Sequence, residues 1–223
     1  MPVLNEREIK KPYFDINRGF PPTITELSEY TGKDKINIAC TQLNGSDRDK
    51  KRVLTDWINF FHSNRTAFKA IYFRSHVPQR LFNAACCQEN LNELYFKWGA
   101  YTDLSALENL KRLKYLYIGS GAGVRDITTL GNLKTLIVLH VENFKRMEDY
   151  SLLTALDKLE QLVISGPILG KTPIKDLDFL VNMQSLLSFW RPNTTLRKKY
   201  TSDEWATLRM SLPNLTFCYN SGW

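Results

Sequence analysis

The 223-residue sequence predicts an α/β solenoid, with a curved parallel sheet on a concave face and 3₁₀ turns or short helices on a convex face. Three observations lead to this fold class. A pattern of apolar residues recurs at a nearly constant spacing, a second pattern that contains an aspartate follows the clear copies, and the two chain ends are capped differently from the middle. Regular spacing over many units is far more specific than any single motif.

The first pattern reads apolar-x-x-apolar-x-apolar and has four clear copies. They are LNELYF (91–96), LKYLYI (113–118), LIVLHV (136–141) and LEQLVI (159–164). Weaker copies begin at Phe68, Leu186 and Leu212. The alternation at the end of each copy predicts a short strand whose apolar side chains point to one side.

The second pattern follows each predicted strand and reads apolar-x-Asp-apolar-x-x-Leu-x-x-apolar. Its aspartates are Asp103, Asp126, Asp149 and Asp176. The spacing of three predicts a helical or 3₁₀ turn. Because the aspartates occupy equivalent positions in every unit, we expect them to cap turns and not to act as acids.

Together the two patterns resemble the leucine-rich repeat, in the short bacterial form seen in internalins, over roughly residues 68–219. Stacked units bury their leucines between them, since one unit alone cannot. The expected core is therefore Leu91, Leu94, Phe96, Leu104, Leu107, Leu110, Leu113, Leu116 and Ile118. The family usually places an asparagine after the strand, whereas this chain has Gly99, Gly121, Phe144 and Pro167, so we expect less regular turns.

The chain ends are predicted to close the stack, because an open sheet edge invites aggregation. Residues 1–32 form an extension that covers the N-terminal edge or stays partly loose, and residues 33–67 a capping repeat with a helix over 46–62 that Ser46 or Asp47 caps. Residues 68–200 hold the repeats, including a shorter helix within 78–87. In residues 201–223, a capping box over 201–204 begins a helix that a last strand follows.

The repeat register also predicts which strand residues face the concave surface. One column across the strands comprises Tyr72, Tyr95, Tyr117, His140, Val163, Trp190 and Thr216. Beside it lie Arg74, Lys97, Trp98, Tyr115 and Glu142. Except for Val163 and Thr216, these residues are the predicted partner-binding set, since Tyr, Trp and Arg are enriched in binding hot spots. The alternative is that the aromatic rings only pack on one another in ladders.

These features favour a non-enzymatic scaffold that binds a protein partner, as an inhibitor, an antidote or an adaptor. The sequence contains no known catalytic motif, and His62, His76 and His140 lie in different units, so neither a metal nor another cofactor is expected. The alternative is nucleic-acid binding through Arg74, Lys97 and the basic segment 191–199. The net charge of +7 arises from 30 basic and 23 acidic residues that are mixed along the chain, which favours an ordinary solvated surface over a nucleic-acid-binding one.

The stretch SGPILGKTP (165–173) is similar to a phosphate-binding loop but is one residue short between its first glycine and Gly-Lys. The repeat register explains it as a four-residue insertion at the rim of the sheet, so no nucleotide is expected.

The first residues carry charges where a secretory signal would be apolar, and no membrane-spanning run occurs. With four cysteines in no framework spacing, the sequence predicts a cytoplasmic protein.

Overall fold

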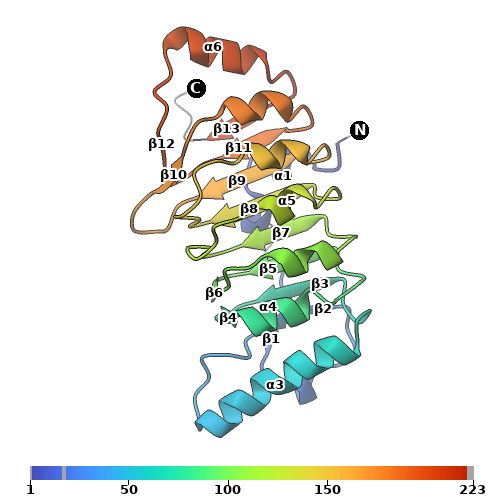
Figure 1. Ribbon diagram of the computed structural model, residues 1–223. Coiled ribbons are helices and arrows are strands. Elements are labelled where there is room, and N and C mark those ends of the chain that lie inside the picture. Colours follow the sequence, from blue (N-terminus) through green and yellow to red (C-terminus); the bar gives the residue numbers. More distant parts are fainter. Residues whose placement is uncertain (1, 17–18, 220–223) are drawn as a thin grey trace.

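The computed structural model describes residues 2–16 and 19–219, which form a solenoid (Figure 1). Its main sheet has nine strands, and each pairs in parallel with the strand of the next unit. In spatial order the strands are β1 (Thr23–Ile24), β2 (Lys35–Ile38), β3 (Ala70–Phe73), β5 (Glu93–Phe96), β7 (Tyr115–Ile118), β8 (Val138–Glu142), β9 (Gln161–Ser165), β11 (Ser188–Trp190) and β13 (Phe217–Tyr219). The predicted repeat therefore sets the order of the sheet.

Helices cover one face of the sheet, while the chain's N-terminal segment, blue in Figure 1, lies on the other. The covering helices are α3 (Asp47–Ser63), α4 (Gln79–Ala85), η2 (Ser105–Asn109), α5 (Thr128–Gly131), η3 (Ser151–Ala155) and η4 (Asp178–Asn182), and α6 (Ser202–Met210) closes the C-terminal end. We call the face without these helices the strand face. It carries the short helices α1 (Glu6–Ile9) and α2 (Tyr13–Ile16).

The leucine positions of the repeat fill the space between the sheet and the helices. All nine residues predicted to form the core are at most 3% exposed. Burying one such side chain contributes about 1.5–3 kcal/mol, so the stacked leucines are the main source of stability. The core prediction is confirmed.

Each repeat aspartate holds the turn that precedes the next helical segment. The carboxylates of Asp103, Asp126, Asp149 and Asp176 accept the main-chain N–H two residues later at 2.8, 2.8, 2.9 and 3.1 Å. The hydrogen bond from the Ser105 N–H keeps the pKa of Asp103 below its usual value. The aspartates are turn residues, as their repetition predicts.

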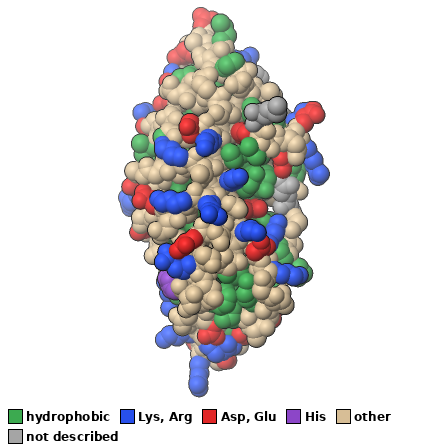
Figure 2. Space-filling view, turned by 90° about the vertical axis from the view of Figure 1, so that its right-hand side faces the viewer, with side chains coloured by type: hydrophobic (Ala, Val, Ile, Leu, Met, Phe, Trp, Pro, Cys, Tyr) green, Lys and Arg blue, Asp and Glu red, His purple; other side chains and the backbone are tan. Residues whose placement is uncertain are grey.

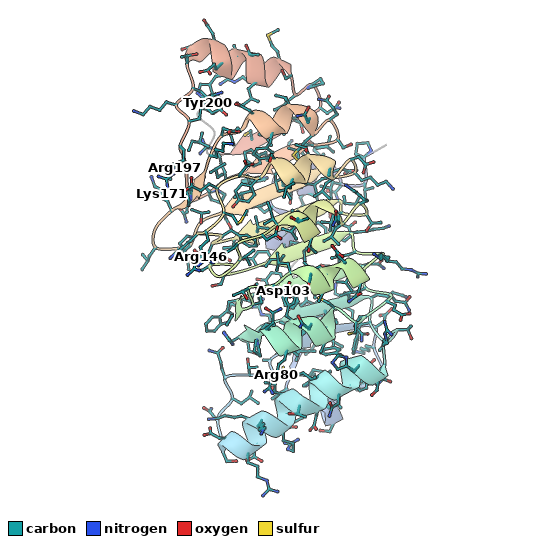
Figure 3. All side chains as sticks on the ribbon, in the orientation of Figure 1. Arg80, Asp103, Arg146, Lys171, Arg197 and Tyr200 are labelled. Carbon is teal, nitrogen blue, oxygen red and sulfur yellow. The ribbon has the colours of Figure 1, made fainter. Side chains whose placement is uncertain are left out.

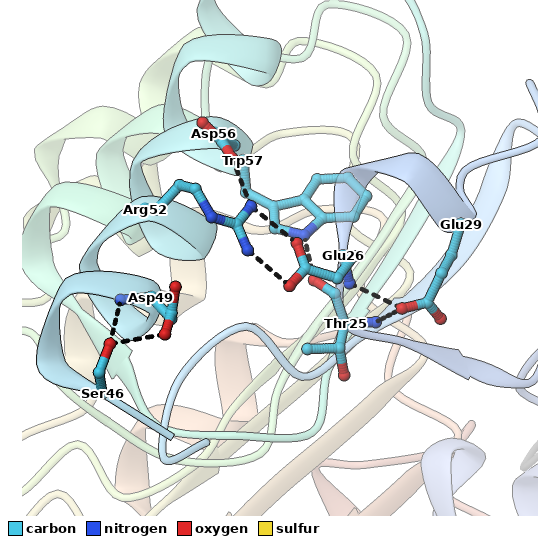
Figure 4. Close-up of polar contacts among 8 residues, drawn as sticks. All are labelled: Thr25, Glu26, Glu29, Ser46, Asp49, Arg52, Asp56 and Trp57. Carbon is cyan, nitrogen blue, oxygen red and sulfur yellow. Dashed lines mark hydrogen bonds and ion pairs between the residues drawn. The ribbon is translucent and has the colours of Figure 1, made fainter. Parts of the chain in front are cut away.

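The N-terminal cap is fixed to the chain that precedes it (Figure 4). Ser46 caps α3 by accepting the Asp49 N–H at 3.2 Å. The fully buried Trp57 donates its indole N–H to the Thr25 carbonyl at 2.7 Å, and Arg52 pairs with Glu26 at 2.8 Å. These contacts attach the 3₁₀ turn η1 (Leu27–Glu29) to the helix.

The register of the last strand differs from the predicted one. Trp190 lies opposite Tyr219, and Phe189 lies opposite Cys218. Thr216 precedes the strand and is not part of the predicted column. Leu212 and Leu215 are joined by a turn in which the Leu215 N–H bonds the Leu212 carbonyl at 3.1 Å. Leu215 therefore corresponds to the first leucine of the other copies, and the predicted register is wrong by three residues.

The insertion at 166–171 forms a loop at the end of the sheet where the strands exit. It leads into the strand β10 (Thr172–Ile174), which pairs with β12 (Thr194–Leu196), whereas a phosphate loop would lead into a helix. A similar small ladder joins β4 (Val77–Pro78) to β6 (Gly99–Ala100). The side chains of Ile168 and Leu169 at the loop tip are 92% and 90% exposed. Figure 3 labels Lys171, the last residue of this loop.

Candidate binding surface

Six of the predicted column residues lie in one row across the strand face, because the parallel strands pair in register. The row is Tyr72, Tyr95, Tyr117, His140, Val163 and Trp190. The rings of Tyr95 and Tyr117 stack with centroids 4.4 Å apart, and Tyr117 meets His140 edge-on at 4.3 Å. The aromatic ladder that was the alternative interpretation is therefore present.

The N-terminal strap, residues 2–16 and 19–24, covers the part of this row from Tyr72 to Tyr117, and the sequence interpretation did not foresee it. Phe14 lies against Tyr95 and Tyr117, with ring centroids 5.7 and 5.6 Å apart. Nearer the N-terminal cap, the Phe20 ring lies 4.3 Å from that of Tyr72. The strap then ends in β1 at the edge of the sheet, so it extends well beyond the edge that residues 1–32 were expected to cover.

Two buried polar side chains hold the strap through its main chain. The Glu160 carboxylate accepts the N–H groups of Val3 at 2.7 Å and Leu4 at 2.8 Å. The Gln161 amide accepts the Tyr13 N–H at 2.6 Å and donates to the Glu8 carbonyl at 2.7 Å. Neither side chain belonged to the predicted site. Both lie where β9 begins. A polar side chain at that position was the signal by which the sequence could have indicated them.

The predicted site residues fall into three groups by the exposure of their side chains. Tyr72, His140 and Trp190 are buried, at 0%, 8% and 9% exposure. The half-buried members are Arg74, Tyr95, Tyr115, Tyr117 and Glu142. Lys97 and Trp98 are exposed where the strands exit. A partner that leaves the strap in place can reach the second and third groups only.

Burial controls the protonation of several groups on the strand face. His140 is neutral, because burial lowers its pKa to about 3, and its Nε2 lies 2.9 Å from the Ser165 hydroxyl. The Tyr117 hydroxyl donates to the Glu142 carboxylate at 2.5 Å, and burial raises the pKa of Tyr117. Burial also raises the pKa of Glu93.

An open cleft of about 420 Å³ remains between the strap and the ends of the strands. It is lined by Phe14, Asp15, Phe20, Arg74, Tyr95, Lys97 and Tyr117. The Arg74 guanidinium lies 5.2 Å from the centre of the Phe20 ring, a cation–π distance. Among the described residues, no ion pair joins Arg74 or Lys97 to an acid. The cleft thus combines aromatic walls with two basic side chains and one acidic side chain, Asp15.

The basic segment 191–199 is largely engaged within the molecule. Arg197 pairs with Glu148 at 2.8 Å, and Lys198 pairs with Asp178 at 2.9 Å. Arg191 is half-buried, and desolvation lowers its pKa. Figure 3 places Arg197 at the strand-exit edge, and Figure 2 shows basic and acidic side chains interspersed on another side of the solenoid.

A cysteine–histidine contact that spacing alone could not reveal lies on the helical side. The Cys87 sulfur is 3.5 Å from the His62 Nδ1, across α4 and α3. Cys86 is buried and Cys87 half-buried, both in the turn that follows α4. Within residues 2–16 and 19–219, no group of three or more histidine, cysteine or acidic side chains is arranged to hold a metal. No helix there has the length and apolarity to cross a membrane.

Comparisons with known proteins find similarity in structure only. No protein-family model matches the sequence, and no curated protein does. Internalin C2 from Listeria monocytogenes is 20% identical with a TM-score of 0.47, and the match covers 68% of this chain and 61% of that one. Internalin F from the same organism is 19% identical with a TM-score of 0.46, covering 68% and 54%.

A leucine-rich-repeat protein from Leptospira interrogans is 10% identical with a TM-score of 0.39, covering 89% of this chain and 58% of that one. This chain therefore spans less than two thirds of the length of each of these three proteins. The architecture is established by the chain's own repeat, by the parallel register of its strands and by its leucine core. By these features the chain is a leucine-rich-repeat solenoid.

Proposed function

We propose that this chain is a non-catalytic scaffold that binds a protein partner on its strand face, as an adaptor or as an inhibitor of that partner. The observation that carries the proposal is the cleft beside the strap, where Arg74 and Lys97 stand among aromatic rings. Aromatic walls with a few convergent polar groups are typical of recognition sites.

The charges of the cleft indicate what part of a partner would enter it. The two basic side chains outnumber the one acid, Asp15, and together with Phe14 and Phe20 they favour an acidic side chain next to an apolar one. Trp98 extends the surface at the strand exits, and its ring lies 5.4 Å from that of His76. The partner-binding set retained in the proposal is Tyr72, Arg74, Tyr95, Lys97, Trp98, Tyr115, Tyr117, His140, Glu142 and Trp190, with the buried members reached only if the strap moves.

Nucleic-acid binding has less support. The cations of Arg197 and Lys198 are already paired with carboxylates, so fewer remain to release counterions from a phosphate backbone. The aromatic rings that would stack on bases lie under the strap. Binding of single-stranded DNA or RNA at low salt would reverse this preference.

The proposal is tested by affinity capture from a lysate of the source organism, followed by mass spectrometry and titration of the captured protein. Reversing both cleft charges, with Arg74→Glu and Lys97→Glu, should weaken binding of that protein by at least about 2 kcal/mol. The matched control reverses Lys111 and Arg112, two exposed cations where the strands begin. Equal binding by both double variants would refute the cleft as the contact site.

Tyrosine variants are a poorer test of this proposal. Tyr95→Ala and Tyr117→Ala each remove a contact with Phe14 as well as part of the row. A change in binding could then come from the strap or from the face itself. Lys97→Glu alone avoids this ambiguity, since Lys97 is exposed and has no ring contact with the described part of the strap, whereas Arg74→Glu also removes the cation–π contact with Phe20.

A further inference from the structure

The strap is packed separately from the leucine core. Leu4 and Phe14 form a small cluster with Ile137 and Val138, against which Tyr13 and Tyr115 also pack. The main core contains none of the strap's residues before Ile24. The leucines are therefore enclosed by the solenoid itself, and the strap lies on a finished sheet.

The strap is held largely by contacts that are not specific to its sequence. Glu160 and Gln161 bond main-chain N–H and carbonyl groups, which any peptide can present. Leu4, Tyr13 and Phe14 add apolar and aromatic contacts, with Tyr13 and Phe14 as adjacent anchors. This combination of a main-chain clamp with side-chain pockets is how proteins commonly bind peptides.

From these contacts we propose that the strand face between β5 and β9 is a peptide-binding site that the strap occupies in cis. A protein partner enters it by replacing residues 2–16 with a segment of its own that carries two adjacent aromatic residues. The inference rests on the proposed function, because it assumes that the strand face receives a partner. The inference adds two points to the proposed function. It gives the chemistry of the partner segment that binds, and it identifies the strap as the competitor that controls access to the strand face.

The attachment of η1 to α3 determines the strength of the competition. Trp57 and Arg52 hold Thr25 and Glu26, so a released strap stays tethered next to the face. A short tether gives an effective concentration on the order of millimolar. A peptide in solution can bind only the molecules whose strap is open. Its apparent affinity is therefore weakened by the ratio of strap-covered to strap-open molecules.

The test uses a fluorescein-labelled peptide of residues 1–24 and the full-length protein. Leu4→Ser with Phe14→Ser weakens the strap but leaves every residue of the face unchanged. Fluorescence anisotropy should show the labelled peptide binding this double variant at least about tenfold more tightly than the wild-type protein. Val3→Ser, at a strap side chain that is 55% exposed, is the matched control and should behave like the wild type.

Three results would overturn the inference. They are no binding to either protein, equal binding to both, and loss of cooperative unfolding in the double variant, which would make the strap part of the folding unit. A labelled peptide that carries both serines should fail to bind, and its binding would equally count against the site. None of these results depends on the foreign partner, so failure here is distinct from failure of the cleft variants.

Discussion

The rings of Tyr13 and Tyr115 stack with their centroids 4.4 Å apart and their planes 12° from parallel. This contact joins the N-terminal strap to a residue that the repeat register assigns to a partner. Burial raises the pKa of both phenols, so both stay neutral at physiological pH. The chain itself therefore supplies an aromatic side chain that occupies part of the predicted partner-binding set.

Tyr13→Ala should loosen the strap without unfolding the solenoid. The substitution removes the stacked pair and about 1 kcal/mol or more of favourable ring contact. Trypsin cleavage after Arg7 and Lys10 should accelerate several-fold, while the melting temperature changes little. The exposed Val3→Ala is the control, and an unchanged cleavage rate for Tyr13→Ala would show that the stacking does not hold the strap.

Leu116→Ala should destabilise the whole solenoid. Leu116 is fully buried in the centre of the stack, and truncation leaves a cavity that costs about 2–5 kcal/mol. The free energy of unfolding from urea denaturation measures the loss. Leu152→Ala, at a side chain that is 49% exposed, should cost no more than about 0.5 kcal/mol. Similar losses for the two variants would contradict the assigned core.

Gly166→Ala should also be destabilising, because the loop at 166–171 passes close to another turn. A Cβ on Gly166 would lie 1.8 Å from the Asn193 carbonyl oxygen, so the main chain must shift. We expect a loss of about 1–3 kcal/mol. Gly19→Ala, where nothing lies within 4 Å of the added atom, is the control and should be nearly neutral in a thermal melt.

His140 should make stability depend on pH. Burial lowers its pKa to about 3, so below the ordinary value of 6.5 the unfolded chain binds a proton that the folded chain does not. The His140 contribution is fully present above pH 6.5 and decreases as the pH falls, by up to about 1.4 kcal/mol per unit. Urea denaturation at pH 7.5 and 5.0 should show a larger loss for the wild type than for His140→Gln. Equal losses would mean that His140 is not buried as a neutral imidazole.

Sequence reasoning succeeded where periodicity determines structure. The leucine spacing predicted the core and the row from Tyr72 to Trp190, because side chains alternate along a strand and units stack in register. The aspartate spacing predicted the turns. The register failed only at Thr216, where the unit is lengthened and Leu212 was matched to the wrong position.

The occupant of the strand face could not be predicted from the same periodicity. The repeat shows which way Tyr95 and Tyr117 point but not what covers them. The strap lies far from its contacts in sequence, with Leu4 bound at Glu160. Its apolar residues, Leu4, Ile9, Tyr13, Phe14 and Phe20, were visible in a segment taken to be peripheral. Apolar side chains spread through an extension indicate that it packs against something.

Hydrogen exchange on the wild-type protein tests most directly the claim that the strand face is a binding site held closed by the strap. The amides of Val3, Leu4 and Tyr13, bound by Glu160 and Gln161, should be protected but should exchange faster than the amides of β7 and β8. This order would mean that opening the strap costs less free energy than unfolding the sheet. Exchange at the rate of a free peptide, or as slow as that of the sheet, would contradict the account.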